Sequence, residues 1–114
     1  MTQRHAEALK WGTDYFMGCH TSDYEFIGQI GDGYADHSVW DSPENLDDMD
    51  RPVYTITSSC PGSDLAGETA AALASSSIFF SSIGEQDYAD QCLEHAKTLF
   101  DFADTYRGEE KVEK

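Results

Sequence analysis

The feature that most constrains this chain is the long segment at residues 21–62, which lacks helical periodicity and lies between helical segments. Loops longer than about 12–15 residues are uncommon in compact domains, and those that occur are usually functional or disordered. Disorder is disfavoured here because the segment is rich in aromatic and branched aliphatic side chains. Short extended pieces are expected at Glu25–Ile30 and Pro52–Thr57. The sequence therefore predicts a long functional loop on a helical frame.

The first helix of that frame is predicted at residues 2–19. Ala8, Trp11, Tyr15 and Cys19 recur there at helical spacing and are expected to form its apolar face. Glycines inside the segment weaken the helix, because glycine costs about 1 kcal/mol relative to alanine in a helix interior. The pattern still favours a helix over the whole range.

Two further helices are predicted to form an antiparallel hairpin. The first of them follows Pro61-Gly62, with Ser63 as a candidate N-cap, and the second ends at Gly108, which is suited to a left-handed cap. The short connection between them contains Gly84. The expected apolar face of the first comprises Leu65, Thr69, Ala72, Leu73, Ser76 and Phe80. That of the second comprises Ala89, Cys92, Leu93, Ala96, Leu99, Phe100, Ala103 and Tyr106.

The charge of the chain excludes several classes of partner. Lysine and arginine number 7 and aspartate and glutamate 22, so the formal net charge is −15. Nucleic acids and anionic membranes require a basic surface, and neither is expected as a partner. Residues 21–62 hold nine acidic side chains and only Arg51 as a base, which places eight of the fifteen negative charges (9 − 1 = 8) in this segment. A neutral polysaccharide is not repelled by such a surface.

The cysteines and histidines give little evidence for a metal site or a disulfide. The three cysteines are widely spaced and form no C-x-x-C pair, which disfavours a zinc site. Cys92 lies on an apolar helical face and is interpreted as a buried thiol. Whether Cys19 and Cys60 form a disulfide stays open, because spacing alone does not decide it. His20 and His95 lack a histidine partner at i+4 and are interpreted as structural or surface residues.

The carboxylates of the long segment allow a hypothesis of acid–base catalysis. Asp32, Asp36, Asp41 and Glu44 include candidates for the carboxyl pair with which glycosidases flank a scissile bond. Trp40 would then offer an apolar platform to the C–H face of a sugar ring. The alternative is that these carboxylates are solvated or bind backbone N–H groups in Asx turns, which is the more common arrangement.

Cation and nucleotide binding fit the segment poorly. The acidic residues at 47–50 do not match the spacing of an EF-hand loop. Gly31-Asp32-Gly33 lacks the third glycine of a dinucleotide fingerprint and is not expected to open a helix. No metal and no cofactor are therefore predicted.

Several motifs together resemble glycoside hydrolase family 9, the cellulases built as an (α/α)6 barrel. The resemblance spans residues 11–108 with few gaps. The matching motifs are Trp11-Gly12-Thr13-Asp14-Tyr15-Phe16, Gly28-Gln29-Ile30-Gly31-Asp32-Gly33, Ala35-Asp36-His37 with Trp40, Pro61-Gly62-Ser63-Asp64-Leu65-Ala66, Glu68-Thr69-Ala70-Ala71-Ala72-Leu73-Ala74 and Phe102-Ala103-Asp104-Thr105-Tyr106-Arg107-Gly108.

The resemblance implies an all-α fold that forms part of an (α/α)6 barrel, with a long irregular loop between the first two helices. Residues 1–108 would be part of a catalytic domain, and residues 109–114 a charged disordered tail. The implied activity is hydrolysis of internal β-1,4-glucosidic bonds with inversion. The family's general base lies in an Asp-Ala-Gly-Asp motif and its general acid near the C-terminal end of the domain. Neither is in this sequence, so no catalytic residue is expected within it.

The resemblance also implies substrate-binding residues. His37 and Trp40 match positions that line sugar subsites, where His37 would hydrogen-bond a glucose unit and Trp40 would stack on one. Asp36 is included with them and is expected, with Asp32, to shape the loop. The expected ligand is a β-1,4-glucan polysaccharide or oligosaccharide. Departures from the family pattern at residues 42–46 leave the preferred glucan open.

The isolated chain is expected to be inactive, as a piece of a larger cellulase. The family is mostly secreted, which implies an extracellular parent enzyme, although residues 2–7 carry no apolar region typical of a secretory signal. The alternative is a non-catalytic carbohydrate-binding or assembly module derived from such a domain.

Overall fold

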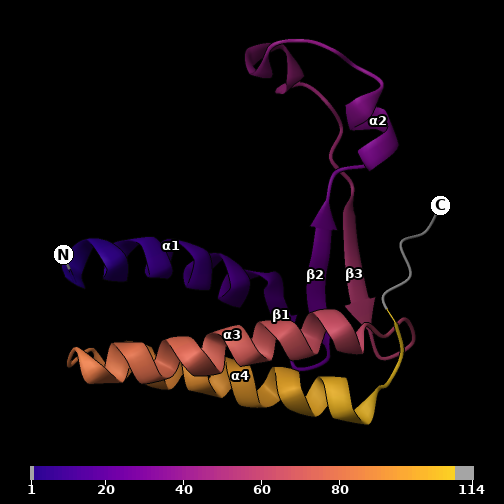
Figure 1. Cartoon of the computed structure of the whole chain (residues 1–114). Helices are drawn as coiled ribbons and strands as arrows, with labels where there is room; N and C mark the ends of the chain where they lie inside the picture. The colour runs from indigo at the N-terminus through magenta and orange to yellow at the C-terminus, as the bar shows by residue number, and fades with distance from the viewer. Residues whose placement is uncertain (1, 110–114) are drawn as a thin grey trace.

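A helical hairpin, a third helix and a projecting β-hairpin make up the fold of the computed structural model, which describes residues 2–109 (Figure 1). The elements are α1 (Thr2–Cys19), β1 (His20–Ser22), β2 (Glu25–Ile30), α2 (Gly33–His37), the 3-10 helix η1 (Pro43–Leu46), β3 (Val53–Thr57), α3 (Ser63–Ser82) and α4 (Gln86–Thr105). The three predicted long helices and both predicted extended pieces are confirmed. None of the helices among residues 2–109 combines the length and apolar character needed to cross a lipid bilayer.

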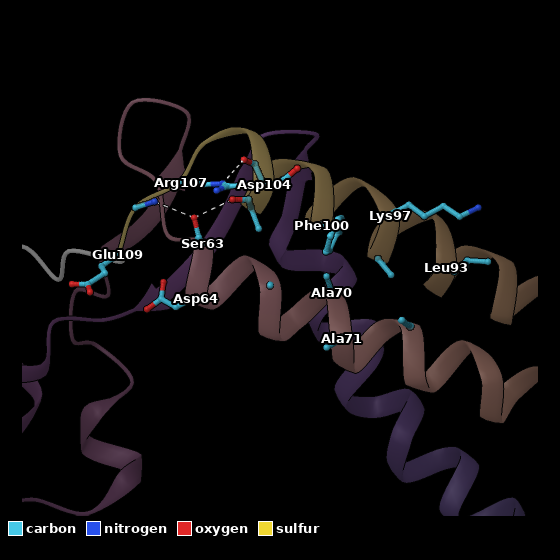
Figure 2. Close-up of a pocket in the computed structure, with 15 residues that line it drawn as sticks. Ser63, Asp64, Ala70, Ala71, Leu93, Lys97, Phe100, Asp104, Arg107 and Glu109 are labelled. Atoms are coloured by element: carbon cyan, nitrogen blue, oxygen red, sulfur yellow. Dashed lines mark hydrogen bonds and ion pairs between the residues drawn. The ribbon is translucent and has the colours of Figure 1, made fainter.

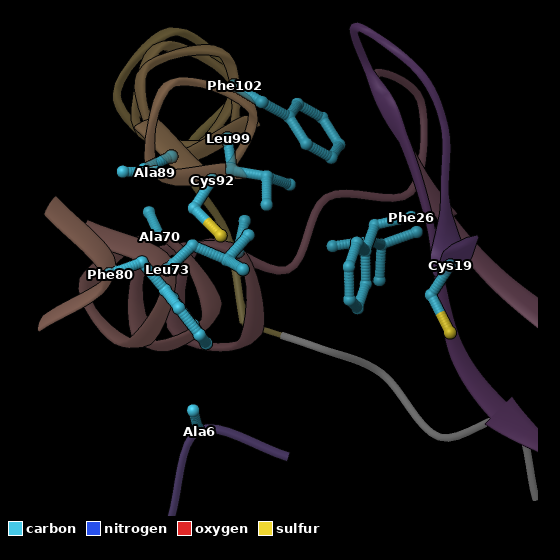
Figure 3. Packing of buried hydrophobic residues seen from close by; sticks show 13 residues of the cluster. Ala6, Cys19, Phe26, Ala70, Leu73, Phe80, Ala89, Cys92, Leu99 and Phe102 are labelled. Atoms are coloured by element: carbon cyan, nitrogen blue, oxygen red, sulfur yellow. The ribbon is translucent and has the colours of Figure 1, made fainter. Parts of the chain in front are cut away.

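The core lies between α3 and α4, which pack against each other along their length (Figure 3). Burial of a large apolar side chain is worth about 1.5–3 kcal/mol, so this interface carries most of the stability. Gly84 turns the chain between the two helices with φ +84°, a conformation that other residues rarely adopt. The largest fully buried side chains are Leu73, Phe80, Cys92, Leu99 and Phe102.

The helical faces are narrower than predicted. Ala72, Leu93 and Phe100 are exposed, whereas Phe102, which the predicted set omits, is buried. Each helix touches the other along one stripe, and residues at the edge of a broad apolar face lie outside that contact. The remaining large apolar positions of the predicted faces are buried or half-buried.

The predicted apolar face of α1 is wrong. Ala8, Trp11 and Tyr15 are exposed, and only Cys19 of that set is buried. The helix instead meets α3 and α4 through small and polar residues, with Thr13 almost fully buried. The Thr13 hydroxyl hydrogen-bonds the hydroxyl of Tyr88 on α4. Polar contacts therefore contribute to the docking of α1, whereas Trp11 and Tyr15 stay exposed and the Tyr15 ring contacts only its helix neighbour Phe16 among aromatic rings of the described residues.

The helix ends near residue 63 also differ from the prediction. Gly62, not Ser63, is the N-cap of α3 and makes no side-chain capping bond. The Ser63 hydroxyl instead donates to the carbonyl groups of Ala103 and Tyr106 at the C-terminal end of α4 and accepts the N–H of Gly108 at 3.0 Å. The predicted left-handed cap at Gly108 is wrong, because φ of this residue is not positive. Glycine fits this position because the chain passes close to Pro61: a Cβ atom on residue 108 would lie 2.7 Å from Cγ of Pro61.

The three strands form an antiparallel sheet in the order β1-β2-β3. Phe26 pairs with Ile56 across the β2–β3 ladder, and both side chains are buried. This apolar pair anchors the hairpin against the helical part of the core. The ladder continues past a register shift between Ile27 and Gln29 to its last pair, Ile30 and Val53. The hairpin carries α2 and η1 at its far end (Figure 1).

All three cysteines are free thiols within the described part of the chain, and Cys92 is buried as predicted. Cys19 and Cys60 form no disulfide in this structure. Of the predicted disordered tail at residues 109–114, only Glu109 lies within the described residues. The division into a partial catalytic domain and a tail stays a prediction.

Candidate functional site

The candidate site lies where the β2–β3 ladder ends. The N–H group of Gly31 donates to the carbonyl group of Pro52 at 2.7 Å, one step beyond the last strand pair. The side-chain amide of Gln29 donates to the Gly31 carbonyl group at 2.8 Å. Gly31 has φ +92°, which turns the chain out of the strand. These contacts define the base of a projecting loop, residues 31–52, hereafter the tip loop.

Asp32 begins helix α2 within this loop. Its Oδ1 atom accepts the N–H group of Ala35 at 2.9 Å, which makes Asp32 a regular N-cap. Its Oδ2 atom accepts the hydroxyl of Tyr54 on β3 at 3.2 Å. The Ala35 amide, and then the Tyr54 hydroxyl, hold the pKa of this carboxyl below its ordinary value. The prediction that Gly31-Asp32-Gly33 does not open a helix is therefore wrong.

His37 lies at the last position of α2. Its Nδ1 atom is 2.6 Å from the carbonyl oxygen of Gly33. A carbonyl oxygen only accepts, so Nδ1 carries the proton and Nε2 of the neutral ring is a hydrogen-bond acceptor. The His37 side chain is 86% exposed, and the carboxylate of neighbouring Asp36 is 52% exposed. Two of the three predicted substrate-binding residues thus sit side by side in sequence on one short helix, both open to solvent.

Trp40, the third predicted residue, follows α2 and is fully exposed. Tyr34 on α2 is 78% exposed, although it is not among the predicted substrate-binding residues. Its spacing of i, i+3 from His37 would have placed both on one helical face, had the helix been predicted. Two large aromatic side chains are therefore exposed on the same loop as His37. Large apolar groups exposed together are typical of binding surfaces.

Two further carboxylates of the tip loop, Asp41 and Glu44, accept hydrogen bonds from groups within the loop itself. Asp41 accepts the side-chain amide of Asn45 at 2.8 Å and the N–H group of Ser42 at 2.7 Å, and these bonds lower its pKa in that order. The pKa of Glu44 is also lowered. A catalytic general acid needs a raised pKa, so Asp32, Asp41 and Glu44 lack that property. Asp41 thus binds a backbone N–H group rather than a substrate, but that group belongs to the next residue, Ser42, so the contact is not an Asx turn.

Metal ligation finds little support in the described part of the chain. No group of three or more His, Cys, Asp or Glu side chains among residues 2–109 is arranged to hold a metal ion. The structure does bring together His20 and His95, whose Nδ1 atoms lie 2.7 Å apart. Sequence spacing gave no signal for this pair, because the two residues are 75 positions apart. Burial and the neighbouring His95 lower the pKa of His20.

A concave surface lies on one face of the α3–α4 hairpin (Figure 2). This groove has a volume of about 860 Å³ and is lined mainly by small apolar residues, with Phe100 as the aromatic side chain of its lining. Charged residues, among them Asp104 and Arg107, lie at the end near Ser63 (Figure 2). Ligand sites usually combine an apolar wall with a few convergent polar groups. The groove has the apolar wall, and its charged side chains other than Lys97 lie near one end.

Comparison with known protein families identifies the family of this chain. The family model described as Glycosyl hydrolase family 9 matches residues 1–114. The chain therefore belongs to glycosyl hydrolase family 9. This confirms the resemblance drawn from the sequence motifs.

Relatives in this family are named endoglucanases. The endoglucanase of Dictyostelium discoideum is 48% identical over 108 residues, which cover 95% of this chain and 15% of that protein. Endoglucanase 2 of Oryza sativa subsp. japonica is 51% identical over 102 residues, covering 90% of this chain and 16% of the relative. The chain thus spans less than a fifth of the length of these relatives.

Solved structures agree with the fold. The endoglucanase of the termite Nasutitermes takasagoensis superposes with a TM-score of 0.85 at 55% identity, covering 91% of this chain and 24% of that one. The cellulase Cel9M of C. cellulolyticum superposes with a TM-score of 0.86 at 35% identity, covering 95% and 25%. A structure of Cel9M in complex with cellobiose is also similar, with a TM-score of 0.85. The described residues thus share their mostly helical fold with a quarter of these enzymes.

Proposed function

We propose that this chain supplies part of the glucan-binding cleft of an endo-β-1,4-glucanase that hydrolyses its substrate with inversion. The observation that carries the proposal is the full exposure of Trp40 on a loop held by hydrogen bonds at its base. A flat apolar ring in that position offers a stacking surface for the C–H face of a glucose unit. The family's endoglucanase relatives support the same substrate class.

His37 and Asp36 would bind the hydroxyl groups at the edge of the sugar. The neutral His37 ring presents Nε2 as an acceptor, since Nδ1–H is bonded to the Gly33 carbonyl group. The half-exposed Asp36 carboxylate also accepts hydrogen bonds. Both groups suit a ligand whose edge is a row of O–H donors. The high negative charge of the chain does not oppose a neutral glucan.

The catalytic base and acid are proposed to lie in other parts of the parent enzyme. Three carboxyl groups of the tip loop have lowered pKa values, which suits structural acceptors and not a general acid. The chain covers about a quarter of the solved family members, which leaves ample sequence for both groups elsewhere. The isolated chain is accordingly proposed to be inactive as a hydrolase.

The exposed apolar faces support a place within an (α/α)6 barrel. Trp11 on α1 is 85% exposed and Phe100 in the groove is 66% exposed. The radius of gyration is 16.2 Å, whereas a self-contained domain of this length has about 13 Å. Further helices of a parent domain would cover these faces. The same proposal places the parent enzyme outside the cell, where it would encounter a glucan polymer.

Affinity electrophoresis of the 114-residue chain through soluble hydroxyethylcellulose tests the binding role. The glucan is expected to slow wild-type migration and to have no effect on Trp40→Ala. Trp11→Ala is the matched control, because it removes a similarly exposed indole outside the tip loop. Unchanged retardation of Trp40→Ala, or no retardation of the wild type, would contradict the proposed binding surface.

A second measurement addresses catalysis. Incubation of the chain with carboxymethylcellulose is expected to release no reducing sugar, and turnover that Asp36→Ala abolishes would overturn the proposed inactivity.

The coding sequence on both sides of this segment would distinguish a part of a cellulase from a non-catalytic module. A codon run for Asp-Ala-Gly-Asp upstream is expected for the cellulase and would be missing for the module.

A further inference from the structure

Hydrogen bonds join the tip loop to the sheet at two residues, Gly31 and Asp32. Gly31 is tied to β3 and to Gln29 through backbone and amide hydrogen bonds, so the chain is fixed as far as this residue. Beyond it comes α2, which has only five residues. A helix this short is unstable by itself, because fixing the backbone of its first turn costs more free energy than the hydrogen bonds of one turn recover. Something outside α2 must therefore hold it in place.

Asp32 makes that connection with both of its carboxylate oxygens. Oδ1 accepts the Ala35 N–H group from inside the helix, and Oδ2 accepts the Tyr54 hydroxyl from β3. Tyr54 is half-buried on β3, and Ile56, two residues further along the same strand, belongs to the core. One half-buried carboxylate thus joins the first turn of α2 to β3.

The next turn of α2 carries the ligand-facing group. The His37 ring is oriented by its bond to the Gly33 carbonyl group, the first residue of the helix. That bond exists only while α2 is folded, since it spans one helical turn. The placement of the ring and its tautomer therefore both depend on the cap at Asp32.

We propose that Asp32 is the positioning residue of the tip loop: by binding Ala35 and Tyr54 at once it sets the place and tautomer of His37 and thereby strengthens glucan binding. This inference rests on the proposed function of the loop. Asp32 itself touches no sugar in this scheme. Its effect passes through α2 to His37.

The experiment compares glucan affinity among variants of the 114-residue chain. Asp32→Ala is expected to weaken binding of soluble hydroxyethylcellulose at least tenfold, and Tyr54→Phe about three- to tenfold. Asp32→Asn keeps an oxygen for the Ala35 amide and a polar group for the Tyr54 hydroxyl, so its affinity is expected within about twofold of wild type. Rescue by asparagine distinguishes positioning from a requirement for negative charge.

The matched control removes the same type of bond elsewhere. The Tyr24 hydroxyl donates to Asp101 on α4 at 3.0 Å, outside the tip loop. Tyr24→Phe is expected to leave glucan affinity unchanged. The ¹⁵N shifts of the His37 ring provide a second readout, because the Nδ1-protonated tautomer should dominate in the wild type and be lost in Asp32→Ala. Circular dichroism of each variant is the control for retention of its helices.

The outcomes separate this inference from the function on which it rests. Binding lost in Trp40→Ala but unchanged in folded Asp32→Ala would overturn the positioning role and leave the binding surface intact. Equal weakening by Tyr24→Phe and Tyr54→Phe would also overturn it, since the effect would then be general. A wild-type chain that binds no glucan removes the proposed function, and the positioning role with it.

Discussion

His20 and His95 face each other with 2.7 Å between their Nδ1 atoms, although 75 positions separate them in the sequence. At this distance one nitrogen donates and the other accepts, so one proton serves both rings. The contact joins the start of β1 to α4. It is a pH-sensitive link between the sheet and the helical hairpin, because two protonated rings would repel each other.

Acid is therefore expected to destabilise the chain from about pH 6.5 downward. Burial lowers the folded-state pKa of His20, with an opposing contribution from Asp23 and a further lowering by His95. Between the lowered folded value and the ordinary value, the unfolded state binds more protons, so the free energy of unfolding falls as pH falls. Thermal melts at pH 5 and 7.5 measure the effect.

His20→Gln is expected to reduce this pH dependence. His37→Gln is the comparison, because its ring is exposed on the tip loop and does not join two elements. Equal melting temperatures of the wild type at the two pH values would contradict the role of the pair.

Asp32 is expected to titrate below the ordinary range for an aspartate. The Ala35 amide, followed by the Tyr54 hydroxyl, favours its charged form and lowers its pKa. A lowered carboxyl pKa contributes stability that is present above the unfolded value and lost as pH falls through the folded one. The amide proton shift of Ala35, followed by NMR from pH 6 to pH 2, should report this midpoint. A midpoint at or above about 3.9 would show that the cap is not formed.

Gly108→Ala is expected to destabilise the chain by about 1–3 kcal/mol, because over-packing of a close contact costs that much. The added Cβ atom would lie 2.7 Å from Cγ of Pro61, at the junction where Ser63 binds the Gly108 backbone. Gly67→Ala is the control, because Gly67 lies inside α3 and a Cβ atom there would meet no other part of the chain within 4 Å. That change should stabilise the helix by up to about 1 kcal/mol. Urea denaturation of both variants gives the comparison.

Leu99→Ala and Phe100→Ala test the narrow contact face of α4. Leu99 is fully buried, so its truncation is expected to cost about 2–5 kcal/mol. Phe100 points toward the open groove and is 66% exposed, so its truncation should cost well under half as much. A greater loss of stability in Phe100→Ala than in Leu99→Ala would contradict the narrow contact face and favour the broad apolar face that the sequence pattern predicted.

Local patterns were sufficient for the existence and type of the main elements. The apolar spacing of α4 and the alternation of β3 predicted both elements, because periodicity reflects how a helix or strand places its side chains. The family motifs also identified glycosyl hydrolase family 9, which the family model confirms. Helix α2 was missed because five residues give no periodic signal, although an aspartate three positions before Ala35 is a usual capping arrangement.

The sequence by itself determined the helical segments, the two extended pieces, the buried state of Cys92 and the family. The tertiary structure decided which residues meet: Asp32 with Tyr54, His20 with His95, and Ser63 with Gly108. It also decided that α1 docks through Thr13 and leaves Trp11 exposed. The physical reason is that periodicity specifies a face within one element, whereas the partner of that face depends on how distant elements pack together.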